Sequence, residues 1–451
     1  MIEIVSFLAC LYPALSRTTV RQLSCIAMAI LAMTGRVTMR GISRWTGDGG
    51  SYRTVQRFFS TVIPWGTLFW LFFRTHLYHP NDVYLIAGDE CVVTKSGKCT
   101  HGLDRFFSSL YGKTVPGLAF FALSLVSTKE RCSFPMRIEQ VVKSDAEKAA
   151  AQANKKKAQK RKSSTPKRKP GRPKGSKNKD KSQVILTHEL TRIQHMVQEL
   201  LALVGTFFPL TYLVLDGHFG NNNALQMTQQ CALQLISKLR SDAALYFRYE
   251  GLYLGRGPRR KYGDRLKPYD IPAKYLQQVS VQDGIETRVY QGGMLHKEFA
   301  QPLNVVVIVK THLSTQRKAH VLLFSSDLSL PWDKLIDYYS LRFQLEFNFR
   351  DAKQYWGLED FMTVKKTTVT NAANLALFMV NLSTRLLRDF HQTHPLFSVL
   401  DLKAHCRGAK YVEETIKLLR QKPDPILLDH IRRRVATIGA IHNVQAEMSP
   451  A

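Results

Sequence analysis

The segment Pro331–Gly357, PWDKLIDYYSLRFQLEFNFRDAKQYWG, combines helical periodicity with a concentration of charged and aromatic residues. It predicts one helix of about six to seven turns, capped by Ser329 and ending at Gly357. One apolar face indicates packing on a core, through Tyr338, Leu341, Leu345, Ala352 and Trp356. A neighbouring face, about 60° wide, carries four polar side chains, which are Tyr339, Arg342, Glu346 and Lys353. The helix would therefore present one carboxylate among cations.

The polar face of this helix has two interpretations. An ordinary solvated face would carry a ladder of ion pairs from Arg342 through Glu346 to Arg350, spaced four residues apart. Alternatively, the carboxylate belongs to a site for chemistry. Only the second interpretation requires further acids at the ends of upstream strands.

Composition restricts the class of protein. The 451 residues include 64 Lys and Arg against 35 Asp and Glu, which gives a net charge of +29. This charge implies a polyanionic partner, and it favours nucleic acid over an anionic membrane surface. A hydrophobic content of 45% is typical of a globular chain, and the length suggests about three domains. No apolar stretch is long enough to span a bilayer. The seven scattered cysteines lack zinc-site spacing, so we expect reduced thiols in a cytoplasmic protein.

Residues 1–80 have a helical pattern. Three short helices with tight glycine turns are expected between Thr18 and Val62, the third capped by Ser51 and carrying Arg53 and Arg57. This pattern favours a helix-turn-helix-like domain that binds DNA through these arginines. The alternative is a small helical subdomain whose arginines are merely solvated.

Two upstream acids lie on or after predicted strands. Three strands are expected between residues 81 and 143, as an antiparallel start to a sheet, and Asp89 shares a face of the first with Val83, Leu85 and Ala87. A later aliphatic strand ends at Asp216, before a glycine-containing turn. The carboxyl end of a buried strand is where α/β sheets place ligand groups. Both residues are therefore candidate partners of Glu346.

A basic segment separates these two acids. Residues 144–183 are rich in Lys and Arg and too polar to bury a core, so we expect them to be disordered when unbound. Within them, PKRKPGRPKGSKNK resembles an AT-hook, in which Arg172 would enter the minor groove of A·T-rich DNA. The alternative is a basic linker that contacts phosphates without a fixed register.

Three carboxylates that converge would repel one another unless cations join them. Oxygen ligands without a Cys or His cluster favour Mg²⁺ or Mn²⁺ over Zn²⁺. Two such ions can activate a water or a 3′-hydroxyl and stabilise the leaving oxygen of a phosphodiester displacement. The residue pattern thus predicts nuclease or strand-transfer chemistry at Asp89, Asp216 and Glu346.

The spacing Tyr-x2-Arg-x3-Glu-x6-Lys on the helix resembles the Y-R-E-K signature of the DDE transposases of bacterial insertion sequences, in particular the family numbered four and its relatives. The resemblance implies a ribonuclease-H-like core in which the three acids are the metal-binding triad. It also implies that Tyr339, Arg342 and Lys353 hold DNA phosphates at the transposon end. The implied protein is prokaryotic and nucleoid-associated, with a homodimer joining two DNA ends.

The expected fold is α/β: a ribonuclease-H-like mixed sheet with helices, interrupted by a mainly β insertion and preceded by the helical DNA-binding domain. The expected core comprises residues 81–143, 184–240 and 327–400, with the insertion at 241–326 and C-terminal helices at 401–451. The insertion contains no Trp for stacking a flipped base, which leaves the excision route open.

The predicted function is a transposase that binds the ends of its element, cleaves double-stranded DNA and joins 3′-hydroxyls to target DNA. The alternative is a catalytically inert, transposase-derived DNA-binding protein or repressor. Intact triad and Y-R-E-K positions favour the active enzyme.

Overall fold

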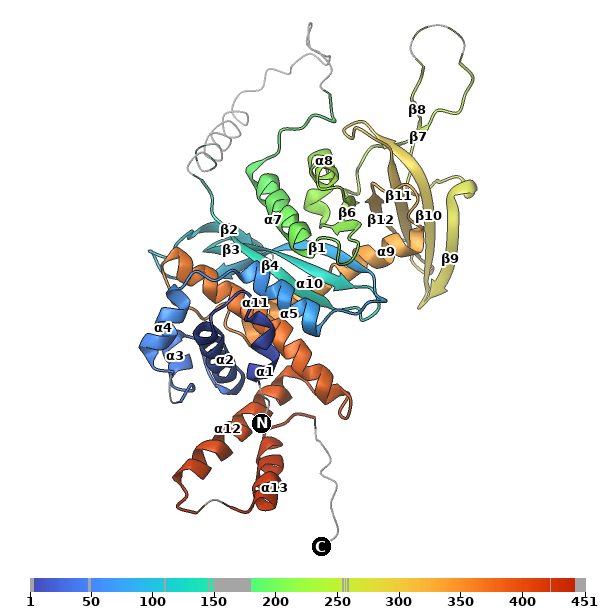
Figure 1. Cartoon of the computed structure of the whole chain (residues 1–451). Helices are drawn as coiled ribbons and strands as arrows, with labels where there is room; N and C mark the ends of the chain where they lie inside the picture. The colour runs from blue at the N-terminus through green and yellow to red at the C-terminus, as the bar shows by residue number, and fades with distance from the viewer. Residues whose placement is uncertain are drawn as a thin grey trace.

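The computed structural model describes residues 4–47, 50–108, 111–144, 147, 149, 180–253, 255, 257, 259–421 and 423–442 (Figure 1). Most of the predicted basic segment, including Arg172 and the AT-hook-like motif, lies outside the described residues. All seven cysteines are free, as expected. Within the described ranges, no helix has the length and apolar character needed to cross a membrane.

The described residues form a mixed α/β fold around a twelve-stranded sheet. The strands are β1 (Tyr84–Thr94), β2 (Asp104–Ser108), β3 (Lys113–Ser127), β4 (Ser133–Val141), β5 (Tyr212–Val214), β6 (Gln234–Leu239), β7 (Leu245–Arg248), β8 (Tyr262–Arg265), β9 (Leu276–Gln282), β10 (Ile285–His296), β11 (Leu303–His312) and β12 (Lys318–Ser325). Their order is β2-β3-β1-β5-β6-β12-β11-β10-β7-β8, with β4 paired to β3 and β9 to β10.

The centre of the sheet is parallel and its flanks are antiparallel. Strand β1 pairs antiparallel with β3, which confirms the predicted antiparallel start, while β2 is a strand that the sequence interpretation missed. Strands β1, β5 and β6 run parallel to one another, so their carboxyl ends share one edge. Strand β12 then pairs antiparallel with β6.

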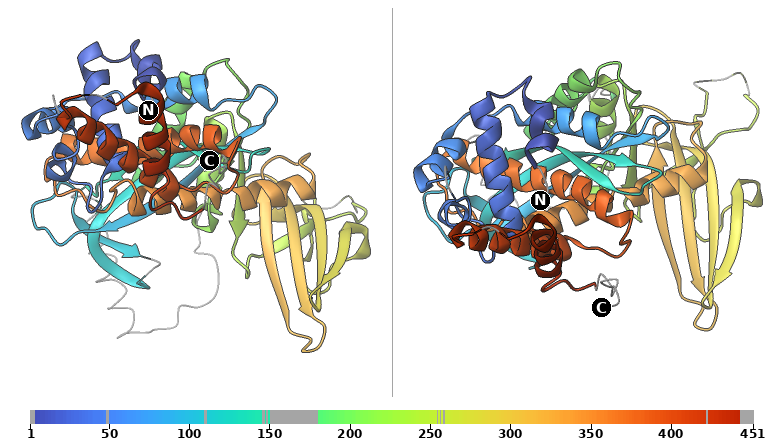
Figure 2. Two further views of the ribbon diagram at one scale, coloured as in Figure 1. Left: turned by 90° about the horizontal axis from the view of Figure 1, so that it is seen from below. Right: turned by 60° about the horizontal axis from the view of Figure 1, so that its bottom comes forward.

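The strands expected as an insertion continue the same sheet beyond β6. Strands β12, β11 and β10 follow in order, and β7, β8 and β9 pair at the far edge. Figure 2 shows β9 to β12, yellow to orange, at the opposite end of the molecule from the blue N-terminal helices. Core and predicted insertion are thus joined by backbone hydrogen bonds between β6 and β12.

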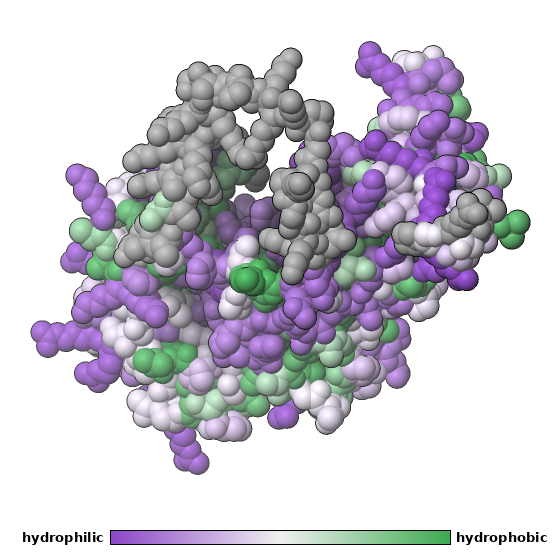
Figure 3. All heavy atoms as spheres, turned by 90° about the horizontal axis from the view of Figure 1, so that it is seen from above, coloured by the Kyte–Doolittle hydropathy of each residue, from purple (hydrophilic) through white to green (hydrophobic). Residues whose placement is uncertain are grey.

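Helices cover the remainder of the sheet. They are α1 (Ile4–Leu8), α2 (Arg17–Ala32), α3 (Met39–Ser43), α4 (Tyr52–Ser60), α5 (Trp65–His76), α7 (His188–Val204), α8 (Asn222–Gln230), α9 (Trp332–Leu341), α10 (Gln344–Gln354), α11 (Lys366–His391), α12 (Val399–Leu418) and α13 (Pro425–Ala436). Three 3₁₀ turns accompany them: η1 (Ala9–Leu11), η2 (Gly217–Phe219) and η3 (Ala273–Tyr275). The visible outer face in Figure 3 is mainly hydrophilic, as a strongly charged chain requires.

The N-terminal helices share a hydrophobic core with the sheet. Trp65 on α5 donates from Nε1 to Oδ1 of Asn371 on α11 at 2.8 Å, and the amide nitrogen of Asn371 donates to the Phe59 carbonyl at 2.8 Å. The Val37 backbone N–H donates to Asp360 at 2.9 Å. These contacts hold α4 and α5 against α11, and the segment before α3 against the loop that follows α10.

The segment between Pro331 and Gly357 forms two helices, so the prediction of a single helix is wrong in this respect. Helix α9 ends at Leu341 and α10 begins at Gln344, with i→i−3 hydrogen bonds across the turn, such as Leu345 N–H to the Arg342 carbonyl at 3.0 Å. Helix α9 packs on β6, β11 and β12, whereas α10 packs on β1 and β4. Because the sheet twists between these strands, we attribute the break to the change of direction.

The predicted N-terminal cap of this helix is also wrong. Pro331 occupies the cap position without a side-chain hydrogen bond, and Ser329 instead donates from Oγ to Asp327 at 2.6 Å. Proline has no side-chain acceptor with which to cap the first turn, although its fixed φ is compatible with the start of a helix. The predicted apolar face is confirmed: Tyr338, Leu341, Leu345, Ala352 and Trp356 are all buried.

Candidate active site

Two of the predicted acids lie side by side at the carboxyl edge of the parallel strands. Ile86 of β1 pairs with Leu213 of β5, and Ala87 pairs with Val214. The same register places Asp89 beside the position of Asp216, two residues after β5 ends. Adjacent strands are about 4.8 Å apart, so the two carboxylates come from neighbouring backbones at one level of the sheet.

The loop after β5 holds Asp216 at this edge. Its side chain accepts a hydrogen bond from the His218 backbone N–H at 3.1 Å, capping η2, and its carbonyl accepts one from Ser237 Oγ at 2.7 Å. Gly220 follows, and a Cβ there would lie only 2.2 Å from the Lys238 carbonyl oxygen. Glycine is therefore required for the loop to pack closely against β6.

Arg342, at the break between α9 and α10, lies between Asp89 and Glu346. Its guanidinium donates to Asp89 in an ion pair, and its Nη2 lies 3.7 Å from Glu346 Oε1. The Arg342 side chain is only 15% exposed. The predicted ladder is present between Arg342 and Glu346, but Arg350 pairs with Asp351 at 2.9 Å instead of with Glu346.

Burial raises the pKa of the Asp89 carboxyl, against the opposing effect of the Arg342 guanidinium, and the Asp216 charge adds to the increase. Burial likewise raises the pKa of Glu346, with Asp89 contributing in the same direction. The charges of these carboxylates therefore affect one another's pKa values. One guanidinium faces three carboxylates, so the cluster holds an excess of negative charge.

The donor set of this cluster fits a hard divalent cation, since it offers carboxylate oxygens and unbalanced negative charge. Among the described residues, the group of three potential ligands whose atoms all lie within 4.8 Å of one another is Glu139, His195 and Glu199, away from this cluster. Arg342 stands between Asp89 and Glu346 instead. A cation that used all three acids would have to displace Arg342 from Asp89.

A cavity of about 620 Å³ opens beside Asp216. Tyr339 and Arg342 line it, which brings two of the predicted phosphate-holding residues to the acids. Its other lining residues were missed by the sequence interpretation, notably Lys238, Arg240 and His320. The sequence did contain a signal for Lys238, which lies two residues after Ile236 in strand β6. Side chains two residues apart on a strand point to the same face.

The remaining predicted site residues lie elsewhere. Lys353 donates from Nζ to the Val92 carbonyl at 2.9 Å and pairs with Glu359 at 3.2 Å, so it contacts β1 three residues beyond Asp89. Arg53 and Arg57 are exposed on α4, which is capped as predicted by Ser51 and packs against α2, α3 and α11.

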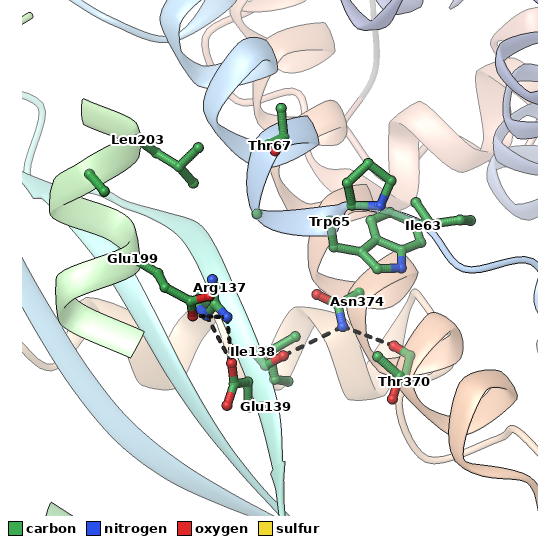
Figure 4. Close-up of a pocket in the computed structure, with 13 residues that line it drawn as sticks. Ile63, Trp65, Thr67, Arg137, Ile138, Glu139, Glu199, Leu203, Thr370 and Asn374 are labelled. Atoms are coloured by element: carbon green, nitrogen blue, oxygen red, sulfur yellow. Dashed lines mark hydrogen bonds and ion pairs between the residues drawn. The ribbon is translucent and has the colours of Figure 1, made fainter. Parts of the chain in front are cut away.

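A second cavity, of about 510 Å³, lies between α5, α7, β4 and α11 (Figure 4). Arg137 of β4 pairs there with Glu139 at 2.6 Å and with Glu199 of α7. His195 lies 3.0 Å from Glu199. The cation already present between the two glutamates makes this cluster an ion-pair network that joins β4 to α7.

The comparison with protein families identifies the class of this chain. The model described as DDE superfamily endonuclease matches residues 10–293, more than half of the chain. The chain therefore belongs to the DDE superfamily endonucleases, a class of metal-dependent, transposase-like DNA-cleaving enzymes, and its mixed sheet with helices is consistent with the ribonuclease-H-like fold of that class. The match includes Asp89 and Asp216, and Glu346 lies beyond it. Comparison with curated proteins finds no match.

Proposed function

We propose that this chain is a transposase of the Y-R-E-K group, which cleaves DNA at the ends of its element and transfers the 3′-hydroxyl to target DNA. The observation that carries the proposal is the register between β1 and β5, with Asp89 and Asp216 at one edge and Glu346 reaching them through Arg342. Membership of the DDE superfamily supports it.

In this proposal Asp89, Asp216 and Glu346 hold two Mg²⁺ ions, for which Mn²⁺ can substitute. When bound, the ions would activate a water or 3′-hydroxyl and stabilise the leaving oxygen of an in-line displacement. Arg342 offsets part of the carboxylate charge, and its guanidinium would hold a phosphate of the substrate. Tyr339, on the wall of the same cavity, orients that phosphate.

DNA contacts outside the cluster extend this assignment. Lys353 holds a phosphate near the carboxyl end of β1, and Arg53 and Arg57 on α4 contact the duplex. The basic segment around Arg172 adds sequence-independent affinity, with or without minor-groove binding. A homodimer that joins two DNA ends completes the proposed complex.

The test substitutes each acid conservatively, as Asp89→Asn, Asp216→Asn and Glu346→Gln. Loss of even an outer-shell partner costs about tenfold to a hundredfold at metal sites, so loss of a ligand should lower Mg²⁺-dependent nicking of supercoiled plasmid by at least roughly a hundredfold. Gel shifts on the same preparations should show DNA binding retained. Glu139→Gln, in the ion-pair network, is the matched control and should nick like the wild type.

A wild-type nicking rate in any of the three variants would exclude that residue from the site. A wild-type chain that binds DNA tightly but never nicks it, with Mg²⁺ or Mn²⁺, would instead support the inert DNA-binding protein or repressor.

A further inference from the structure

A third charged residue stands in line with the two aspartates. Strands β5 and β6 pair in parallel, with Leu213 opposite Leu235 and Val214 opposite Ile236. Continuing this register by two residues places Lys238 beside Asp216. Together with the pairing of β1 and β5, this register places Asp89 on β1, Asp216 just after β5 and Lys238 on β6 at one level of the sheet.

The three side chains also project from the same face of the sheet. The residues two positions before them are Ala87, Val214 and Ile236, and all three belong to the hydrophobic cluster beneath α9. Because strand side chains alternate between faces, residues two apart point to the same side. Lys238 therefore faces the space that Asp216, Tyr339 and Arg342 line.

Most cations around this cavity are already engaged. Arg240 pairs with Asp242 through two hydrogen bonds of 3.0 Å, and Arg342 pairs with Asp89. Both ring nitrogens of His320 have partners. Within the described part of the chain, the exposed ammonium of Lys238 has no ion pair or hydrogen bond. It is thus a cation available to a ligand at the cavity.

The backbone of Lys238 is held tightly against the Asp216 loop. Gly217 and Gly220 pack on the Lys238 main chain, and the neighbouring Ser237 donates to the Asp216 carbonyl. The sheet consequently fixes the distance between the Asp216 carboxylate and the base of the Lys238 side chain. An exposed lysine whose backbone is fixed at this position is suited to bind an anion that lies in the cavity.

We infer that Lys238 is a phosphate-binding residue of this site, which contacts the strand being cut on the side of Asp216 opposite Asp89. The inference rests on the proposed function, since it takes a DNA phosphate as the anion. Lys238 binds as a point charge and neutralises a phosphate oxygen, and that contact strengthens as negative charge grows during displacement.

The experiment compares Lys238→Ala and Lys238→Arg with Lys129→Ala in the full chain. Lys129 is exposed in the turn after β3, beside the start of β1 and away from the level of Asp89. Fluorescence anisotropy with a labelled 30-base-pair duplex in EDTA measures affinity against salt without cleavage. Plasmid nicking with saturating DNA and Mg²⁺ measures the chemical step.

For Lys238→Ala we expect the slope of log affinity against log salt to fall by about 0.9, the value for one phosphate contact. The nicking rate should fall by about tenfold, a loss that one charge-assisted contact accounts for. Lys238→Arg should keep the slope and most of the rate, and Lys129→Ala should keep both quantities and the melting temperature.

An unchanged slope together with an unchanged nicking rate in Lys238→Ala would overturn the inference. So would equal losses in Lys238→Arg and Lys238→Ala accompanied by a lower melting temperature, because that pattern indicates a structural role. If the wild type binds but does not nick, the proposed function fails, whereas the salt slope still decides whether Lys238 contacts phosphate.

Discussion

Two arginines in this molecule are each held between two carboxylates, with different consequences. Arg342 pairs with Asp89 and lies 3.7 Å from Glu346, and Arg137 pairs with Glu139 and Glu199. Their side chains are similarly shielded, at 15% and 20% exposure. Contact geometry and burial alone therefore do not distinguish a candidate active site from a structural ion pair.

The difference lies in what surrounds each pair. Next to Arg342, Asp216 adds a third carboxylate at the same level of the sheet, and neighbouring strands cannot move apart to relieve the repulsion. Next to Arg137, the third group is His195, which contacts Glu199 and adds no further carboxylate. Three carboxylates around Arg342 on a rigid sheet carry more negative charge than Arg342 and the nearby Lys238 neutralise, so this site favours a further cation more strongly than the two glutamates around Arg137 do.

The largest expected difference between the Arg342 and Arg137 networks is in how the stability of the protein responds to Mg²⁺. Arg342→Gln should lower the unfolding free energy of the metal-free protein by about 1–3 kcal/mol, since it leaves Asp89 without its partner. It should also tighten Mg²⁺ binding by about tenfold, because the ion no longer competes with a guanidinium. Thermal melting across a Mg²⁺ titration measures both effects.

Arg137→Gln is the control for this experiment. It should lower the melting temperature by a similar amount and leave the Mg²⁺ response at the wild-type value. A larger Mg²⁺ response in Arg137→Gln than in Arg342→Gln would reverse the assignment of the two networks.

A smaller effect concerns pH. The raised pKa of Asp89 means that the folded chain keeps a proton which the unfolded chain loses near pH 4, so unfolding releases a proton in this window. Without metal, this group therefore makes the protein less stable as pH rises from about 4 to its raised pKa, by at most about 1.4 kcal/mol per pH unit. Asp89→Asn should remove that contribution.

Urea unfolding in EDTA at a series of pH values measures the slope in wild type and variant. Glu139→Gln should keep the wild-type slope. If Asp89→Asn and the wild type show parallel stability profiles between about pH 4 and 7, then Asp89 is not under strain in the folded state.

The smallest effect is expected where both partners of the structural pair are replaced. Arg137→Met combined with Glu199→Leu should change the unfolding free energy by less than about 1 kcal/mol, because Glu199 and the remaining partner Glu139 are partly exposed and solvent screens their charges. Chemical unfolding of the double variant and both single variants tests this. A loss that exceeds the sum of the single variants would show that the pair is more than a structural contact.

Local patterns predicted individual elements well. Alternation along β1 placed Asp89 on the face of Leu85 and Ala87, and the apolar stripe of α9 and α10 is buried as expected. The errors occurred where one element adapts to several others. The helix divides at Arg342 because α9 and α10 follow different strands of a twisted sheet, and no pattern within 27 consecutive residues records that twist.

The sequence by itself determined which residues can carry the chemistry: three acids with suitable positions on elements, a Y-R-E-K spacing and a charge of +29. Periodicity is enough for this, because the face of a strand or helix depends only on neighbours along the chain. The tertiary structure alone decided which groups meet. Parallel pairing of β1, β5 and β6 aligned Asp89, Asp216 and Lys238 across about 150 residues of sequence, and packing of α9 and α10 on the sheet brought Arg342 to Asp89. Register between distant strands is set by side-chain packing on both faces of the sheet, and that information is absent from any single segment.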